Sequence, residues 1–203
     1  MTPFSKLLRS GLALWRKIAS PKVQDWIESG VLLPFCGSTP SSFHIQNKYL
    51  PPPSRDFIKQ EIKDLLRAGV IETTQLKPHC ISPIHCVPKR NGKFRLIHDL
   101  RLLNAWCKPA TFTNESINEV IQLVRPNDVL LTFDIKSGFY HVPVNKAHRK
   151  FLGFEWQGRY YVWKSVPFGL NSSPYFFYKV ICLMNNIYAK KVSALWHLWM
   201  TFF

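Results

Sequence analysis

The chain has 203 residues, 46% of them hydrophobic, and 27 lysines and arginines against 12 acids give it a formal net charge of +15. This length and composition are typical of one globular domain or two small ones, and they exclude an intrinsically disordered chain. A globular protein this basic favours an anionic polymer as partner, with nucleic acid as the first candidate. A basic surface that serves solubility alone is the alternative.

Signals for secretion, membrane insertion or zinc binding are weak. No apolar run approaches the roughly 20 residues that span a bilayer, and Arg9 interrupts any signal-peptide core. The five cysteines are odd in number and none has Cys-x-x-Cys spacing, which indicates a reducing compartment. We therefore expect an intracellular protein of the cytoplasm or nucleus that contacts no membrane. The pairs His79-Cys80 and His85-Cys86 match no common zinc spacing and are interpreted as strand and turn residues, with metal as the alternative.

The N-terminal third of the chain predicts helices separated by a turn-rich segment. Residues 4–18 are basic and amphipathic, which favours a surface helix over a mitochondrial presequence. Prolines and glycines punctuate residues 20–53, so we expect extended segments lying on a core. Ser54 is predicted to cap a helix that continues at helical apolar spacing to Arg67 and ends at Gly69.

The middle of the chain predicts a β-hairpin and then a helix. The hairpin arms are residues 81–88 and 93–99, and the Asn-Gly pair at 91–92 is a strong signal for the turn between them. The helix is capped at residue 113 or 114, carries an apolar face, and ends at Pro126.

A buried strand, a second hairpin and a last helix complete the expected order. The apolar run Val129–Phe133 predicts a strand buried on both faces, and it ends in Asp134. Residues 151–163 predict a hairpin with its turn at Gln157-Gly158, and a helix begins at residues 173–174 and ends near Tyr188. This order predicts an α+β fold, an antiparallel sheet with helices packed on one face.

Three motifs, in this order and spacing, resemble those of a reverse transcriptase (RNA-directed DNA polymerase) of the retrotransposon type. They are Val87–Asn104, Val129–Val144 and Val166–Phe177, within a resemblance that covers about residues 34–181. Residues 14–35 resemble the DIRS-type elements more than the gypsy-type ones.

The resemblance implies polymerase fingers plus a partial palm. Residues 1–50 would be an N-terminal extension, residues 51–125 the fingers-like part and residues 126–190 the partial palm. Residues 191–203 would be a frameshifted tail.

The resemblance also implies the chemistry of a nucleotidyltransferase. Such an enzyme joins the 3′-hydroxyl of a primer, on an RNA or DNA template, to the α-phosphate of a deoxynucleoside triphosphate, with two Mg²⁺ or Mn²⁺ ions. Asp134 would be the catalytic, metal-binding acid, and the backbone carbonyl of Ile135 a further metal ligand. A core strand whose terminal aspartate caps a turn is the alternative on this stretch alone.

Further motif residues are implied to bind the nucleotide. Lys89 and Arg95 flank the turn of the first hairpin and would bind phosphate oxygens. Phe139 falls at the position of the sugar gate, where a ring excludes a 2′-hydroxyl, although a core phenylalanine is a substantial alternative. Phe168 and Gly169 would support the template base and the nucleotide, because glycine permits close backbone approach.

Four basic residues are candidates for contact with the nucleic-acid backbone. They are Arg90, Lys93, Arg159 and Lys164. Without the three motifs, the basic turn around residue 91 would be interpreted as a solvated surface.

A further motif of the family, a strand turn with two adjacent aspartates, does not occur in the written sequence, whose last acid is Glu155. The residues Trp199-Met200-Thr201 require the nucleotides TGG-ATG-ACN, which read from the third base encode Asp-Asp between apolar residues. Chance is the alternative, but we expect a frame slip between about Ile181 and Ala194, which makes residues 191–203 a frameshifted tail.

The chain would then be a truncated fragment that lacks two of the metal-binding acids. Whether it is an enzyme stays open at this point. A non-catalytic nucleic-acid-binding remnant of a retroelement is one alternative, and a degenerate reading frame that makes no stable protein is another.

Overall fold

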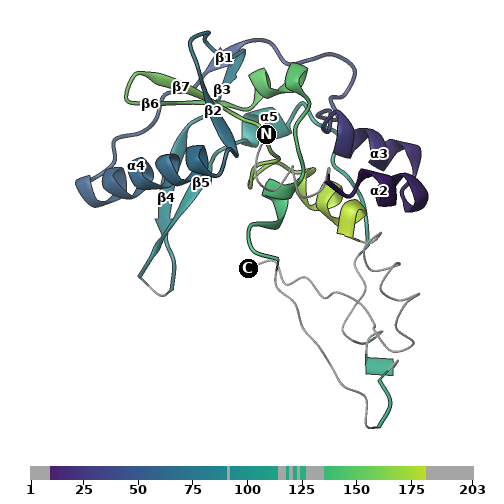
Figure 1. Ribbon diagram of the computed structural model, residues 1–203. Helices are drawn as coiled ribbons and strands as arrows, with labels where there is room; N and C mark the ends of the chain where they lie inside the picture. The colour runs from purple at the N-terminus through teal and green to yellow at the C-terminus, as the bar shows by residue number, and fades with distance from the viewer. Residues whose placement is uncertain are drawn as a thin grey trace.

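The larger of the two described sheets has five strands in the order β1-β3-β6-β7-β2 and lies in the upper part of the view in Figure 1. The computed structural model describes residues 10–90, 92–113, 118, 121–122, 124–126 and 135–181. The sheet strands are β1 (Phe43–His44), β2 (Ile71–Thr74), β3 (Cys80–Ile81), β6 (Gly153–Trp156) and β7 (Arg159–Trp163). β6 and β2 both pair antiparallel with β7, whereas β3 pairs parallel with β1 and with β6. The α+β class with antiparallel pairing is confirmed, and the parallel contacts of β3 are an addition to it.

The second hairpin, β6–β7, turns where the sequence predicts. Gln157 and Gly158 have φ angles of 50° and 74°, and two successive positive φ values are what a tight hairpin turn of the primed type requires. Across the hairpin, Phe154 lies opposite Tyr161, and their rings stack with centroids 5.1 Å apart.

The first hairpin forms a separate two-stranded sheet from β4 (Ile84–Pro88) and β5 (Phe94–His98). Its register places Val87 opposite Arg95. The arm predicted to begin at residue 81 begins instead at Ile84, because Ile81 belongs to β3 and pairs there with β1 and β6. Pro83, which has no N–H to donate, lies where the chain passes from one sheet to the other.

Helix α4 (Pro52–Arg67) contacts β2 and the β4–β5 hairpin and buries Ile58, Ile62 and Leu65 (Figure 1). The prediction that Ser54 caps this helix is wrong, since the helix begins at Pro52. Prolines fit the first helical turn, where the missing N–H has no intrahelical partner in any case. The predicted end is confirmed, because Gly69 follows the helix with a φ of 64°.

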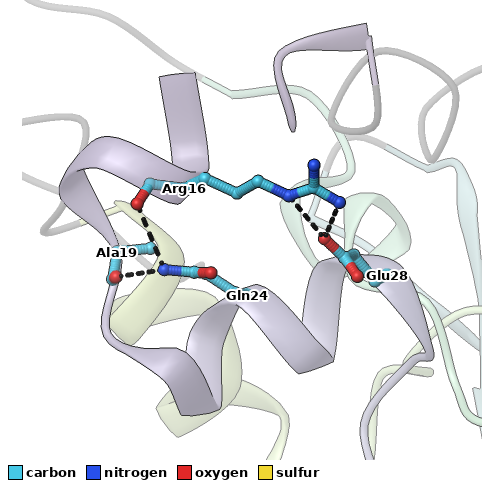
Figure 2. A network of polar contacts seen from close by, with 4 residues as sticks. All are labelled: Arg16, Ala19, Gln24 and Glu28. Carbon is cyan, nitrogen blue, oxygen red and sulfur yellow. Dashed lines mark hydrogen bonds and ion pairs between the residues drawn. The ribbon is translucent and has the colours of Figure 1, made fainter. Parts of the chain in front are cut away.

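Two short helices, α2 (Leu12–Ile18) and α3 (Pro21–Glu28), form the N-terminal part of the described chain. α3 contradicts the extended structure expected over residues 20–53, because Pro21 occupies its first turn and the apolar residues at 23, 26 and 27 share one buried face. Figure 2 shows polar contacts between the two helices: Arg16 donates to the Glu28 carboxylate at 3.1 Å, and Gln24 donates to the carbonyl of Ala19 at 2.8 Å.

The N-terminal helices pack against the last helix, whose described part is residues 173–181 (Figure 1). The ring of Trp26 on α3 meets that of Phe176 edge-on, with centroids 5.1 Å apart. The last helix begins at residue 173, so the residue predicted as its cap is already helical, and its predicted end near Tyr188 lies outside the described residues.

Three short helical turns connect these elements: α5 (Arg101–Asn104), η1 (Gly138–His141) and η2 (Lys146–Phe151). The helix predicted over residues 113–125 falls largely outside the described residues, and the strand that ends in Asp134 falls outside them entirely. None of the described helices is both long and apolar enough to cross a bilayer. The largest fully buried side chains of the core come from every part of the described chain and include Ile27, Ile58, Leu103, Leu152, Phe154 and Trp163.

Candidate nucleotide and nucleic-acid site

Two of the predicted site residues, Phe139 and Phe168, lie against each other. Phe139 belongs to η1 and is only 5% exposed, whereas Phe168 is 46% exposed, and their ring centroids are 4.6 Å apart. The ring of Tyr140 also meets Phe168 edge-on at 5.4 Å. Phe168 is therefore the ring that this cluster presents to solvent, and Phe139 lies buried beneath it.

The backbone around η1 explains how Phe139 reaches this position. Ser137 adopts left-handed angles, φ 55° and ψ 42°, which cost a non-glycine residue roughly 1–2 kcal/mol. A Cβ on Gly138 would overlap the ring of Phe177 in the last helix, so only glycine fits there. Phe177 also meets Phe139 edge-on, with centroids 5.7 Å apart. The Ser137-Gly138 pair thus turns the chain sharply under the loop that carries Phe168.

Gly169 joins this loop to the end of the first hairpin. Its φ is 95°, and a Cβ there would lie 2.8 Å from the carbonyl oxygen of His98, the last residue of β5. Only glycine permits this close approach without strain. This close approach brings the loop that carries Phe168 against the end of β5.

Asn104, at the end of α5, fastens the same loop, and the sequence had not singled it out. Its Nδ2 donates to the carbonyl of Gly169 at 2.8 Å, and its Oδ1 accepts from the N–H of Asn171 at 2.9 Å. The only local signal was a polar residue after an apolar pair, at the end of the first motif.

The first hairpin gathers four of the predicted basic residues near its tip. Lys89, Arg90, Lys93 and Arg95 are all exposed, and the turn is closed by the N–H of Lys89, which donates to the carbonyl of Lys93 at 2.6 Å. Gly92 has a φ of 75°, as the predicted turn requires, while Asn91 lies outside the described residues. Several positive charges on one short hairpin can bind phosphate groups.

The structure does not bring the other two basic candidates to this hairpin. Lys164 has a side chain only 19% exposed and lies 3.6 Å from the carboxylate of Glu72, which also binds Arg149 at 3.1 Å. This ion-pair network links the residue that follows β7 to β2 and to η2. Arg159 is exposed at the turn of the β6–β7 hairpin, well apart from the β4–β5 tip in Figure 1.

Asp134, the predicted metal-binding acid, lies outside the described residues. Ile135 is half-buried, and its side chain packs against the hydrophobic core. Over the described ranges, no three His, Cys, Asp or Glu side chains gather as metal ligands would. In the His79-Cys80 pair, for which zinc binding was the alternative interpretation, burial raises the pKa of the Cys80 thiol to about 11. This shift disfavours the thiolate form that binds zinc.

Comparison with known proteins identifies a family whose model covers the three motifs. Residues 87–200 match the family model described as reverse transcriptase (RNA-dependent DNA polymerase). The enzymatic polyprotein of cauliflower mosaic virus (strain D/H) is 28% identical over 161 residues, which are 77% of this chain and 23% of that protein. The Tf2-7 transposon polyprotein of Schizosaccharomyces pombe is 25% identical over 156 residues, 70% of this chain and 12% of that protein. The chain thus spans less than a quarter of the length of these relatives.

Solved structures show the same fold. The foamy viral protease-reverse transcriptase in complex with dsDNA matches with a TM-score of 0.61 and 25% identity, over 76% of this chain and 32% of that one. The prototype foamy virus protease-reverse transcriptase matches with a TM-score of 0.63 and 21% identity, over 92% of this chain and 28% of that one. Because the family model covers more than half of its residues, the chain belongs to the reverse transcriptase (RNA-dependent DNA polymerase) family and carries a reverse transcriptase domain of a retroelement.

Proposed function

We propose that the intact domain synthesises DNA on an RNA or DNA template, and that the chain in its written frame binds template–primer without extending it. The observation that carries this proposal is the Gly169–His98 contact. It brings the loop with the exposed ring of Phe168 against the hairpin that carries the exposed cations, so that this part of the molecule offers a surface for a base and charges for phosphates. The double-stranded DNA bound by the foamy viral relative supports a nucleic-acid partner.

The basic hairpin is proposed to hold the triphosphate of the incoming nucleotide. Lys89 supplies a compact positive charge, and Arg95 a planar fork that binds two phosphate oxygens at once. Arg90 and Lys93 add to the local positive field and contact the nucleic-acid backbone. The formal net charge of +15 over the whole sequence acts in the same direction.

Phe139 is proposed as the sugar gate that excludes a 2′-hydroxyl. The Phe139 ring is 5% exposed and its centroid lies 4.6 Å from that of Phe168, so a sugar that touches Phe139 would also lie beside the Phe168 ring. In a frame-restored, active protein, Phe139→Ala should admit ribonucleotides, measured as the ratio of kcat/KM for dNTP and rNTP. An unchanged ratio would refute the gate role.

Divalent cations fit the restored sequence and not the written one. Holding two Mg²⁺ or Mn²⁺ ions requires several carboxylates, and the written motifs supply Asp134 with, at most, the backbone carbonyl of Ile135. One carboxylate does not balance two divalent charges. We therefore assign no metal-dependent step to the written chain, and the Asp-Asp pair encoded in the shifted frame would complete the ligand set.

A frame slip between about Ile181 and Ala194, with truncation before the Asp-Asp motif, is part of this proposal. So is an origin in a DIRS-type or gypsy-type retrotransposon, acting inside the cell. Three residues behind the DIRS assignment have structural roles that account for them equally well: Trp15 and Trp26 are buried, and Gly30 lies against the backbone of Asn145.

The test compares the written chain with a frame-restored one. Both are assayed for primer extension with Mg²⁺ and with Mn²⁺, and for template–primer binding by fluorescence anisotropy over a salt series. We expect both to bind with a steep salt dependence and only the restored chain to add nucleotides. Extension by the written chain would refute the proposed role of the missing acids.

The second candidate function, a non-catalytic binding remnant, is favoured by the same exposed cations without the acids. It predicts salt-dependent binding by both chains and extension by neither. Sequencing of genomic DNA and transcript across codons 175 to 203 decides whether the frame slip is present at all.

A further inference from the structure

The side chain of Asn104 is committed entirely to one loop, 65 residues further along the chain. Its amide nitrogen donates to the carbonyl of Gly169 at 2.8 Å, and its amide oxygen accepts from the N–H of Asn171 at 2.9 Å. Asn171 returns the contact, because its own amide nitrogen lies 3.4 Å from the carbonyl of Asn104 and 3.5 Å from that of Cys107. Both polar ends of the Asn104 amide therefore hold backbone groups on either side of Leu170.

The loop that Asn104 holds is anchored at its other points as well. Leu170 is 2% exposed, and the buried hydroxyl of Ser173 donates to the carbonyl of Pro167 at 2.7 Å. The carbonyl of His98 lies against Gly169. Phe168 stands between these fixed points with 46% of its surface exposed, so the backbone on either side decides which way its ring faces.

Asn104 is itself tied to the hairpin that carries the basic residues. It ends α5, which follows β5 after two residues. At the start of α5, the guanidinium of Arg101 binds both carboxylate oxygens of Asp99, at 2.9 Å and 2.7 Å. This ion pair links the first residue of α5 to the residue that follows β5, and Asn104, at the other end of the helix, connects α5 to the Phe168 loop.

We propose that Asn104 is a positioning residue for nucleic-acid binding: its amide holds the loop 167–171 so that the Phe168 ring stacks on the templating base of a bound template–primer. This inference rests on the proposed function, because it takes Phe168 as the residue that touches nucleic acid. Asn104 itself acts through the loop and touches no ligand.

The chemistry of the contact requires an amide. A donor must face the carbonyl of Gly169 while an acceptor faces the N–H of Asn171, and only Asn supplies both at this length. Asn104→Ala removes both bonds. Asn104→Asp keeps the acceptor and sets a carboxylate oxygen against the Gly169 carbonyl, so it should loosen the loop at least as much. Leu102→Ala, at a 42% exposed position of the same helix, is the matched control.

The first measurement is amide hydrogen exchange of the full chain in its written frame. Asn104→Ala should speed exchange at residues 168–172 by about five- to tenfold, the value of a typical net hydrogen bond. Exchange in β6 and β7 should not change, nor should Leu102→Ala have this effect. Unchanged exchange at residues 168–172 would overturn the proposal, because the two hydrogen bonds of Asn104 would then not hold the loop.

The second measurement is a double-mutant cycle on the Kd for template–primer, by fluorescence anisotropy at fixed salt. Loss of one stacked base in Phe168→Ala should weaken binding by roughly five- to a hundredfold, and Asn104→Ala should weaken it by part of that factor. The double variant should bind no more weakly than Phe168→Ala alone, because Asn104 acts only through that ring.

Other outcomes of the cycle overturn the inference. Additive losses of affinity would show that the hydrogen bonds of Asn104 have only a structural role. A loss of affinity in Asn104→Ala without one in Phe168→Ala would show that Asn104 acts through a residue other than Phe168. If neither variant loses affinity, Asn104 does not position a binding residue. The proposed function is judged separately, since the salt dependence of the unsubstituted chain and extension by the restored one do not depend on Asn104.

Discussion

Acidification from pH 7 to pH 5 should destabilise this protein, with the largest contribution from the buried histidine His98; burial also lowers the pKa of His141 and of His148. His98 ends β5 and is 4% exposed. Its ring stacks on that of Trp163 and meets that of Phe154 edge-on, and neither ring nitrogen makes a hydrogen bond of good geometry. Burial lowers the pKa of His98 to about 4, and the nearby backbone groups and Asp99 oppose only part of that shift.

The sign and the size follow from linkage. The folded protein favours the neutral ring, while the unfolded chain takes up a proton near its ordinary pKa of about 6.5. The stabilising contribution is therefore complete above that pH and is lost as the pH falls toward 4. A fall of the His98 pKa from about 6.5 to about 4 corresponds to about 3 kcal/mol in full, of which about 2 kcal/mol is lost between pH 7 and pH 5.

The assay is urea unfolding from pH 5 to pH 8, with His98→Leu as the variant that cannot titrate. The free energy of unfolding of the unsubstituted chain should fall by about 2 kcal/mol more than that of His98→Leu between pH 7 and pH 5. His85→Gln, on the neighbouring strand, should keep the unsubstituted pH dependence because His98 is intact. Parallel profiles for the unsubstituted chain and His98→Leu would refute the reasoning.

Three further changes test other contacts. Gly169→Ala should lower the free energy of unfolding by about 1–3 kcal/mol and weaken template–primer binding, measured by urea melts and anisotropy; full stability would contradict the close approach. His148→Phe keeps a ring but loses the Nδ1 that accepts from the N–H of Leu33 at 2.9 Å, so it should cost about 1–3 kcal/mol and speed exchange of the Leu33 amide, which an unchanged exchange rate would disprove. Arg16→Ala breaks the exposed ion pair with Glu28 (Figure 2) and should cost less than about 1 kcal/mol in the same melts, whereas a larger loss would give this pair a role that its exposure does not predict.

The sequence predicted best those elements that local chemistry decides. The Gln157-Gly158 turn and the end of α4 at Gly69 need positive φ angles, which glycine signals by itself. Helix α3 was missed because Pro21 was interpreted as interrupting structure, although a proline in the first turn starts a helix equally well. The parallel pairing of β3 with β6 joins Ile81 to Gly153, a long-range contact for which the sequence carries no local signal.

In the candidate site, too, the sequence identified some residues, while others could be found only from the folded structure. The resemblance identified Phe139, Phe168 and Gly169, and the structure brings all three together. It did not predict that one ring would cover the other, because burial depends on packing against Phe177 in the last helix. Asn104 could not be found from spacing, since its partners are brought to it only by the folded backbone.

The N-terminal segment belongs to the same folded unit as the region that carries the family motifs. Val31 donates its N–H to the carbonyl of Pro143 at 2.8 Å and forms a bridge with Val144. Just before it, Gly30 has a φ of 90°, and a Cβ there would lie 2.5 Å from the backbone nitrogen of Asn145. With Trp26 packed on the last helix, these contacts continue one hydrophobic core across residues that precede the family match. A protein that began at residue 51 would expose this apolar surface and aggregate, so binding and extension assays require the N-terminal residues even though none of the proposed site residues lies there.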